Sequence, residues 1–84
     1  MSSGNPTSDP LEPLNLPSSI RVQADKLLLA IRSGRTLPDT LRAADRAEGF
    51  ALGLDTVRVL HAIDVEGLYR AFDDAAQIRL AELL

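Results

Sequence analysis

The stretch that decides the fold covers residues 36–84 and reads TLPDTLRAADRAEGFALGLDTVRVLHAIDVEGLYRAFDDAAQIRLAELL. Apolar residues recur in it at the three- and four-residue spacing of α-helices, in a long first segment and in a second that begins near Asp64. We expect the two segments to fold back on each other as a helical hairpin, through a turn near residues 62–64. Thr36 should cap the first segment, because its hydroxyl can accept from the backbone near Asp39 and Pro38 suits a first turn.

The first segment shows two apolar faces when it is plotted at about 100° per residue. One face holds Ala43, Ala47, Phe50, Leu54, Val57 and His61, and the nearly opposite face holds Leu41, Leu52, Val59 and Ile63. A helix with two apolar faces is buried on two sides, or it is broken so that its halves face differently. Gly49, Gly53 and Asp55 offer break points, so one continuous helix and two shorter ones both remain open.

The last helix is expected to start at Asp64 as its N-cap and to present one broad apolar arc toward the core. That arc comprises Val65, Leu68, Tyr69, Phe72, Ala75, Ala76, Leu80 and Leu83. Gly67 is expected where this helix crosses the preceding one closely, since glycine lets backbones approach.

A shorter helix should precede the hairpin, starting at Ser18 or Ser19 and ending before Gly34 as a C′ residue. Its core-facing stripe is predicted to contain Ile20, Ala24, Leu27, Leu28 and Ile31, with Val22 and Leu29 on the opposite side.

Residues 1–17 contain four of the chain's five prolines and no periodic pattern, which predicts a flexible or extended Pro-rich arm ahead of a helical domain at residues 18–84. Leu11, Leu14 and Leu16 lie between the prolines. They are either incidental residues of a tail or arm contacts that dock on the bundle or on a partner. Because the gain from burying three leucines nearly cancels the entropy of ordering the backbone, we expect a loosely held arm.

Composition excludes several classes of function. The 84 residues include no cysteine and one histidine, so a disulfide framework and a thiolate zinc site are ruled out. A net charge of −3 disfavours binding to nucleic acid, whose phosphates attract a surplus of Lys and Arg. The sequence has no signal peptide and no apolar run of about 18 residues, so we expect a soluble, cytoplasmic protein with no membrane contact.

No group of residues predicts catalysis. His61 is the only imidazole, and it shares the Phe50 face, where a core or interface histidine is expected. The adjacent carboxylates Asp73 and Asp74 point about 100° apart on a helix and are poorly placed to chelate an ion. Most charges have an opposite charge at helical spacing, which indicates a solvated surface. These pairs are Arg21–Asp25, Asp39–Arg42, Glu66–Arg70, Arg70–Asp74 and Arg79–Glu82. We expect no enzyme, no metal and no cofactor.

A small DNA-binding regulator is the main alternative. Gly49 and Phe50, followed by residues 55–57, are faintly similar to the turn and start of a recognition helix. The residues that would face a groove are Asp55, Thr56 and Arg58, with Asp45 and Glu48 nearby, whereas a phosphate-facing surface should be basic.

The pattern GFALGL…VL…I-D-x-E-x-L-Y…A…R-x-A-E-L resembles short, uncharacterised helical-hairpin proteins carried by plasmids, prophages and integrative elements of proteobacteria. The resemblance covers roughly residues 34–84 and brings no active site with it. It implies a mobile-element accessory or anti-defence protein that binds and blocks a host protein.

The prediction is an all-α protein of three helices, or four if the middle one breaks, forming a dimeric bundle with an extended arm. Two-sided apolar helices need a second layer of cover, which a homodimer or a protein partner would supply. The predicted interface residues are Val22, Leu29, Leu41, Leu52, Val59 and Ile63. Function is expected to be that of a non-catalytic module that regulates or inhibits an unknown protein, with a structural subunit as a further alternative.

Overall fold

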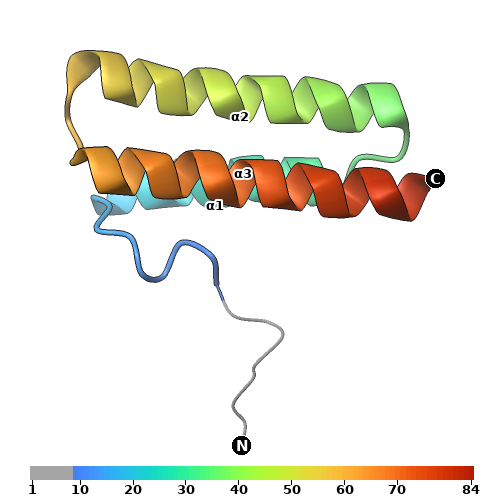
Figure 1. Cartoon of the computed structure of the whole chain (residues 1–84), viewed down its shortest axis with the longest axis horizontal. Helices are drawn as coiled ribbons and strands as arrows, with labels where there is room; N and C mark the ends of the chain where they lie inside the picture. The colour runs from blue at the N-terminus through green and yellow to red at the C-terminus, as the bar shows by residue number, and fades with distance from the viewer. Residues whose placement is uncertain (1–8) are drawn as a thin grey trace, which may run out of the picture.

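A computed structural model describes residues 9–84, which contain three α-helices and no strand (Figure 1). The helices are α1 (Ser18–Arg32), α2 (Leu37–Val57) and α3 (Ala62–Leu83). In Figure 1 α2 runs alongside α3, with α1 behind α3, and each helix contacts both of the others. The described part of the chain is therefore a three-helix bundle, which confirms the all-helical prediction.

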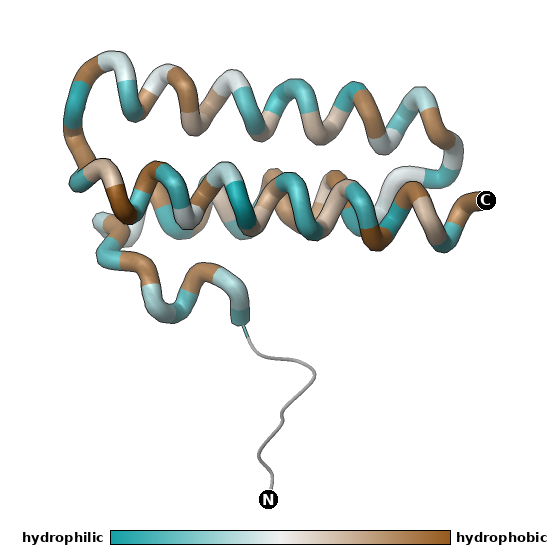
Figure 2. Tube along the Cα trace, in the orientation of Figure 1, coloured by the Kyte–Doolittle hydropathy of each residue, from teal (hydrophilic) through white to brown (hydrophobic). Residues whose placement is uncertain are grey.

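Apolar and polar residues are interspersed along each helix (Figure 2), and the buried ones lie at helical spacing. In α1 the predicted stripe faces the core: Ala24, Leu27, Leu28 and Ile31 are buried and Ile20 is half-buried. The helix starts at Ser18 with Pro17 as its N-cap residue, and the Arg21 amide donates to the Pro17 carbonyl at 2.9 Å. The predicted start at Ser18 or Ser19 is confirmed, but neither serine is the N-cap residue, because the chain is already helical at Ser18.

The start of α2 was predicted correctly. The Thr36 hydroxyl accepts a hydrogen bond from the Asp39 amide at 3.1 Å, and Pro38 lies in the first turn. The helix then runs without interruption through Gly49 and Gly53, so the alternative of a broken helix, and with it a fourth helix, does not hold.

The hairpin turn lies at residues 58–61 and not at residues 62–64. Arg58 adopts the left-handed conformation (φ 56°, ψ 43°), and its amide donates to the Asp55 carbonyl at 3.2 Å, which ends α2. α3 then begins at Ala62 with His61 as its N-cap residue. Asp64 is not the N-cap. It lies in the first turn of α3, 6% exposed, and its carboxylate accepts from the Asn15 amide at 3.0 Å.

The core combines small residues from α2 with larger ones from α1 and α3. The face of α2 toward the core is made of Thr40, Ala43, Ala47 and Ala51, all buried. The arc predicted for α3 is correct: Val65, Leu68, Phe72, Ala75 and Ala76 are buried, and Tyr69, Leu80 and Leu83 are half-buried. Val57 and His61, which the helical plot placed on the core face, are exposed because α2 ends at Val57.

Residues 9–17, the described part of the arm, pack on the side of the bundle formed by α1 and α3. They are not fully extended: the Glu12 amide donates to the Asp9 carbonyl at 3.1 Å and the Leu14 amide to the Leu11 carbonyl at 3.0 Å. Leu11 is fully buried in the core, and Leu14 and Leu16 pack against it. The arm was predicted over residues 1–17, and its residues 1–8 lie outside the described residues.

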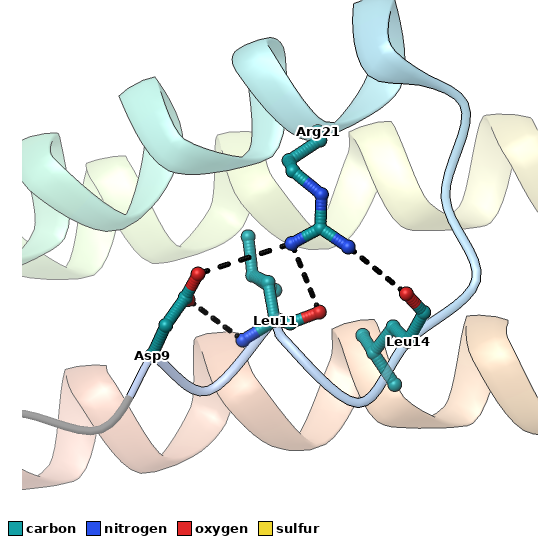
Figure 3. A network of polar contacts seen from close by, with 4 residues as sticks. All are labelled: Asp9, Leu11, Leu14 and Arg21. Atoms are coloured by element: carbon teal, nitrogen blue, oxygen red, sulfur yellow. Dashed lines mark hydrogen bonds and ion pairs between the residues drawn. The ribbon is translucent and has the colours of Figure 1, made fainter.

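A single arginine of α1 binds this segment (Figure 3). The Arg21 guanidinium donates to the carbonyls of Leu11 and Leu14 at 3.0 and 2.9 Å, and it lies 3.8 Å from the Asp9 carboxylate. On α3, a Cβ atom at Gly67 would overlap the Leu14 side chain. Gly67 thus marks a close approach of the arm, and not of the preceding helix as predicted.

Candidate interaction surface

A groove of about 800 Å³ lies between α2 and α3, on a side of the bundle that these two helices share. Its apolar floor comes from both helices. Phe72 and Ala76 are buried, Ala44, Tyr69 and Leu80 are half-buried, and Leu41 stands at the edge, 51% exposed. The alanines leave room between the larger side chains, which keeps the floor recessed.

The rim of the groove is strongly acidic. Five carboxylates line it, together with one cation, Arg70, and all six side chains are on exposed residues. The chain has twelve acidic and nine basic residues. Five of the acidic residues line the groove, compared with one of the basic residues. The acidic residues are Asp45 and Glu48 of α2 and Glu66, Asp73 and Asp74 of α3.

These carboxylates form no ion pair within residues 9–84. The ion pairs found there are Asp9–Arg21 at 3.8 Å, Asp39–Arg42 at 3.7 Å and Arg79–Glu82 at 3.1 Å. The last two were predicted, whereas Arg21 pairs with Asp9 in place of Asp25, and Arg70 bridges neither of its helical neighbours. Exposed pairs gain little over separate hydration, so helical spacing alone does not hold them together. The rim therefore keeps its negative charge.

The six residues predicted as an interface are all more than half exposed, but they do not share one face. Val22 and Leu29 lie on α1, at 54% and 64% exposed, and Leu41 and Leu52 lie on α2. Leu52 follows Leu41 by about three helical turns, which places both on the groove side of α2. Val59 belongs to the turn and Ile63 to α3. The expectation of one face through Leu41, Leu52, Val59 and Ile63 is wrong because α2 ends before Val59.

Sequence reasoning missed the groove itself. Tyr69 and Leu80 were assigned to the core. Glu66 and Asp74 were assigned to a solvated surface, and Asp45 and Glu48 were considered only as neighbours of a DNA-facing turn. A signal was present in each helix, since the acidic residues follow one edge of the apolar stripe in both α2 and α3. Their meeting across one groove depends on how the two helices pack, which neither segment encodes alone.

His61 lies at the start of α3 with its side chain exposed, and its carbonyl accepts from the amides of Asp64 and Val65 at 3.0 and 3.1 Å. Across residues 9–84, no three His, Asp or Glu side chains are grouped so that they could hold a metal ion. Within the same residues, no helix is both long and apolar enough to cross a membrane.

Comparison of the chain with family models, with curated proteins and with solved structures finds no match in any of the three.

Proposed function

We propose that this chain is a non-catalytic protein-interaction module that regulates or inhibits a protein partner. The observation that supports the proposal is the open apolar groove between α2 and α3, which the exposed Leu41 lines. The exposed Leu52 follows on the same side of α2, beyond the residues that line the groove. Leucines that stay in contact with water next to a recessed apolar floor are typical of surfaces that a partner covers. A module that masks a host protein in this way would suit the mobile-element accessory role implied by the sequence resemblance.

The alternative, a small DNA-binding regulator, finds less support. A helix-turn-helix motif would need a turn near Gly49 and Phe50, but α2 is continuous there. The groove presents five carboxylates, and the chain carries a net charge of −3, so phosphates would be repelled where the apolar surface is most available.

We also propose that two copies pair through the outer face of α1. Val22 and Leu29 are two helical turns apart on this face, and both are more than half exposed. Asp25 and Lys26 lie between them in the sequence, so the segment carries no net charge. In an antiparallel pair of α1 helices about a twofold axis, each copy's Lys26 can approach the other's Asp25. This face is distinct from the groove.

Affinity capture from a proteobacterial lysate, followed by mass spectrometry, tests the proposed function. The wild type is compared with the double variant Leu41→Asp/Leu52→Asp and with the control Ile78→Asp, an exposed α3 residue that does not line the groove. Circular dichroism checks that all three are folded. We expect a protein that the wild type and the control retain and the double variant loses.

If no protein is enriched on the wild type over empty resin, the interaction-module proposal fails. A parallel gel-shift assay with duplex DNA at low salt, where phosphate contacts are strongest, should show no retardation. Strong, salt-sensitive retardation would make the DNA-binding regulator the better proposal.

A further inference from the structure

We infer that the groove between α2 and α3 binds a positively charged amphipathic helix of the protein partner. This inference rests on the proposed function and adds the chemistry of the segment that is recognised. The shape of the groove, the charge of its rim and the position of the arm each contribute to it.

The dimensions of the groove match one face of a helix. Its α3 wall runs from Glu66 to Leu80, which is about four helical turns or roughly 20 Å. Along this wall the floor presents Tyr69, Phe72 and Ala76, and α2 adds Leu41 and Ala44 from the other side. A partner helix of about 14 residues would span this length and insert apolar residues spaced three and four apart, as amphipathic helices do in hydrophobic grooves.

The rim determines the charge of that helix. Carboxylates stand on both walls, Asp45 and Glu48 on α2 and Glu66 and Asp73 on α3, and none has a cationic partner within residues 9–84. Lys or Arg side chains that flank an apolar stripe would reach these carboxylates from either side. Complementary charge of this kind speeds association and rejects acidic segments and phosphates.

Neither the described part of the arm nor a second copy is a suitable occupant. Residues 9–17 are already held on the α1–α3 side of the bundle, where Leu11 is fully buried and Arg21 binds two arm carbonyls. A second copy docked groove to groove would bring its own five carboxylates against the first five, and like charges oppose such a contact. A basic segment of another protein meets neither obstacle.

Two synthetic 15-residue peptides test the inference. Both carry leucines along one helical face, and the remaining positions are Arg in one peptide and Glu in the other. Binding is followed by NMR chemical shifts of the ¹⁵N-labelled full chain. We expect the Arg peptide to shift amide signals within residues 41–48 and 66–80, with an affinity that falls as salt is added, and the Glu peptide to leave these signals unchanged.

Charge variants provide the matched comparison. Asp45→Asn/Asp73→Asn removes two rim charges, and the control Glu12→Gln/Asp39→Asn removes two charges from exposed residues that line neither the groove nor the outer face of α1. Because an exposed ion pair strengthens an interaction by about 1.4- to fivefold, loss of two pairs should weaken binding of the Arg peptide to the rim variant by about two- to 25-fold, and the control should bind it like the wild type.

Three results would overturn the inference: equal binding of the two peptides, shifts centred outside the groove, or equal loss of affinity in both charge variants. A fourth would be a wild-type dimer that Leu41→Asp converts to a monomer, since that assigns the groove to a second copy.

The lysate capture reports separately on the proposed function. A partner that is lost with Ile78→Asp but kept with Leu41→Asp/Leu52→Asp would leave the interaction module standing and remove the groove as its binding site.

Discussion

Gly34 and Thr40 show how single residues set the connection between α1 and α2. Thr40 is fully buried, and its hydroxyl donates to the Thr36 carbonyl at 2.9 Å. Gly34 lies against it so closely that a Cβ atom would overlap the Thr40 hydroxyl and approach the Thr40 Cα at 3.0 Å. The Gly34 carbonyl accepts from Nε of Arg79 at 2.8 Å, which ties the connection to α3. The connection has little freedom to shift.

We therefore predict that Gly34→Ala destabilises the protein by roughly 1–3 kcal/mol, the usual cost of an overpacked site. In a domain of this size, each kcal/mol lowers the unfolding midpoint by about 4–8 °C, which thermal circular dichroism resolves. Gly49→Ala is the matched control: nothing lies within 4 Å of its Cβ position, and alanine is favoured in a helix interior by about 0.5–1 kcal/mol. A Gly34→Ala protein as stable as Gly49→Ala would show that the contact is easily relieved.

Thr36 and Gly34, which flank this connection, show which local features can be predicted from the sequence. Thr36 was identified correctly as a cap because its hydrogen bond spans three residues and depends on local geometry alone. Gly34 was identified correctly as the C′ residue, since α1 ends at Arg32 with Ser33 as its C-cap residue, but no glycine of residues 9–84 has a positive φ, so it does not act there through a left-handed conformation. Its role is steric and depends on Thr40 in the next helix, so the pattern around Gly34 could not reveal it.

The apolar periodicity of the sequence predicts the three helices, but it does not predict where α2 ends or how the arm is held. The core stripes of α1 and α3 were predicted almost residue for residue. The end of α2 was missed because it occurs at Arg58, a residue type that rarely takes the left-handed conformation and gives no stop signal. The arm was expected to be loosely held because the burial of its leucines was weighed only against backbone entropy. That comparison leaves out Arg21, whose guanidinium contacts the arm from α1.

The burial of Leu11 leads to a prediction for the arm as an element. Leu11→Ala should lower the free energy of unfolding by about 2–5 kcal/mol, because it removes a fully buried side chain from the core. Leu84→Ala, at a leucine that is 92% exposed, is the control and should change it by less than about 0.5 kcal/mol. Denaturant titration measures both. If Leu11→Ala matches the control, the arm is not part of the folded unit in solution.

At the scale of the whole molecule, the groove depends on features that no single segment contains. Asp45 and Glu48 belong to one helix and Glu66 and Asp73 to another, and only antiparallel packing of α2 and α3 brings them to one rim. The sequence predicted the hairpin, and with it the packing partners, but not which edges of the two helices would face each other. Those edges depend on contacts outside the hairpin, since α1 packs against both helices and the arm packs against α3 at Gly67.

The proposed self-contact through α1 and the proposed partner site in the groove are separate surfaces. Substitutions in them should therefore change the oligomeric state differently. If copies pair through α1, light scattering of the wild type should give about twice the chain mass of 9.1 kDa. Leu29→Asp would place a charge in the centre of that contact and should give the single-chain mass. Leu41→Asp, at the edge of the groove, should leave the mass unchanged, because the acidic rim keeps this surface out of any self-contact. Circular dichroism establishes that both variants remain helical.

A wild-type protein of single-chain mass at micromolar concentration would contradict pairing through α1, and Val22 and Leu29 would then be isolated exposed residues of the kind common on monomers. A mass that falls with Leu41→Asp and not with Leu29→Asp would instead place the self-contact in the groove. In that dimer, ten carboxylates, five from each copy, would surround one interface and repel one another. Such a dimer should dissociate as the salt concentration is lowered, because screening of the repulsion would be lost, whereas a dimer formed through α1 should persist.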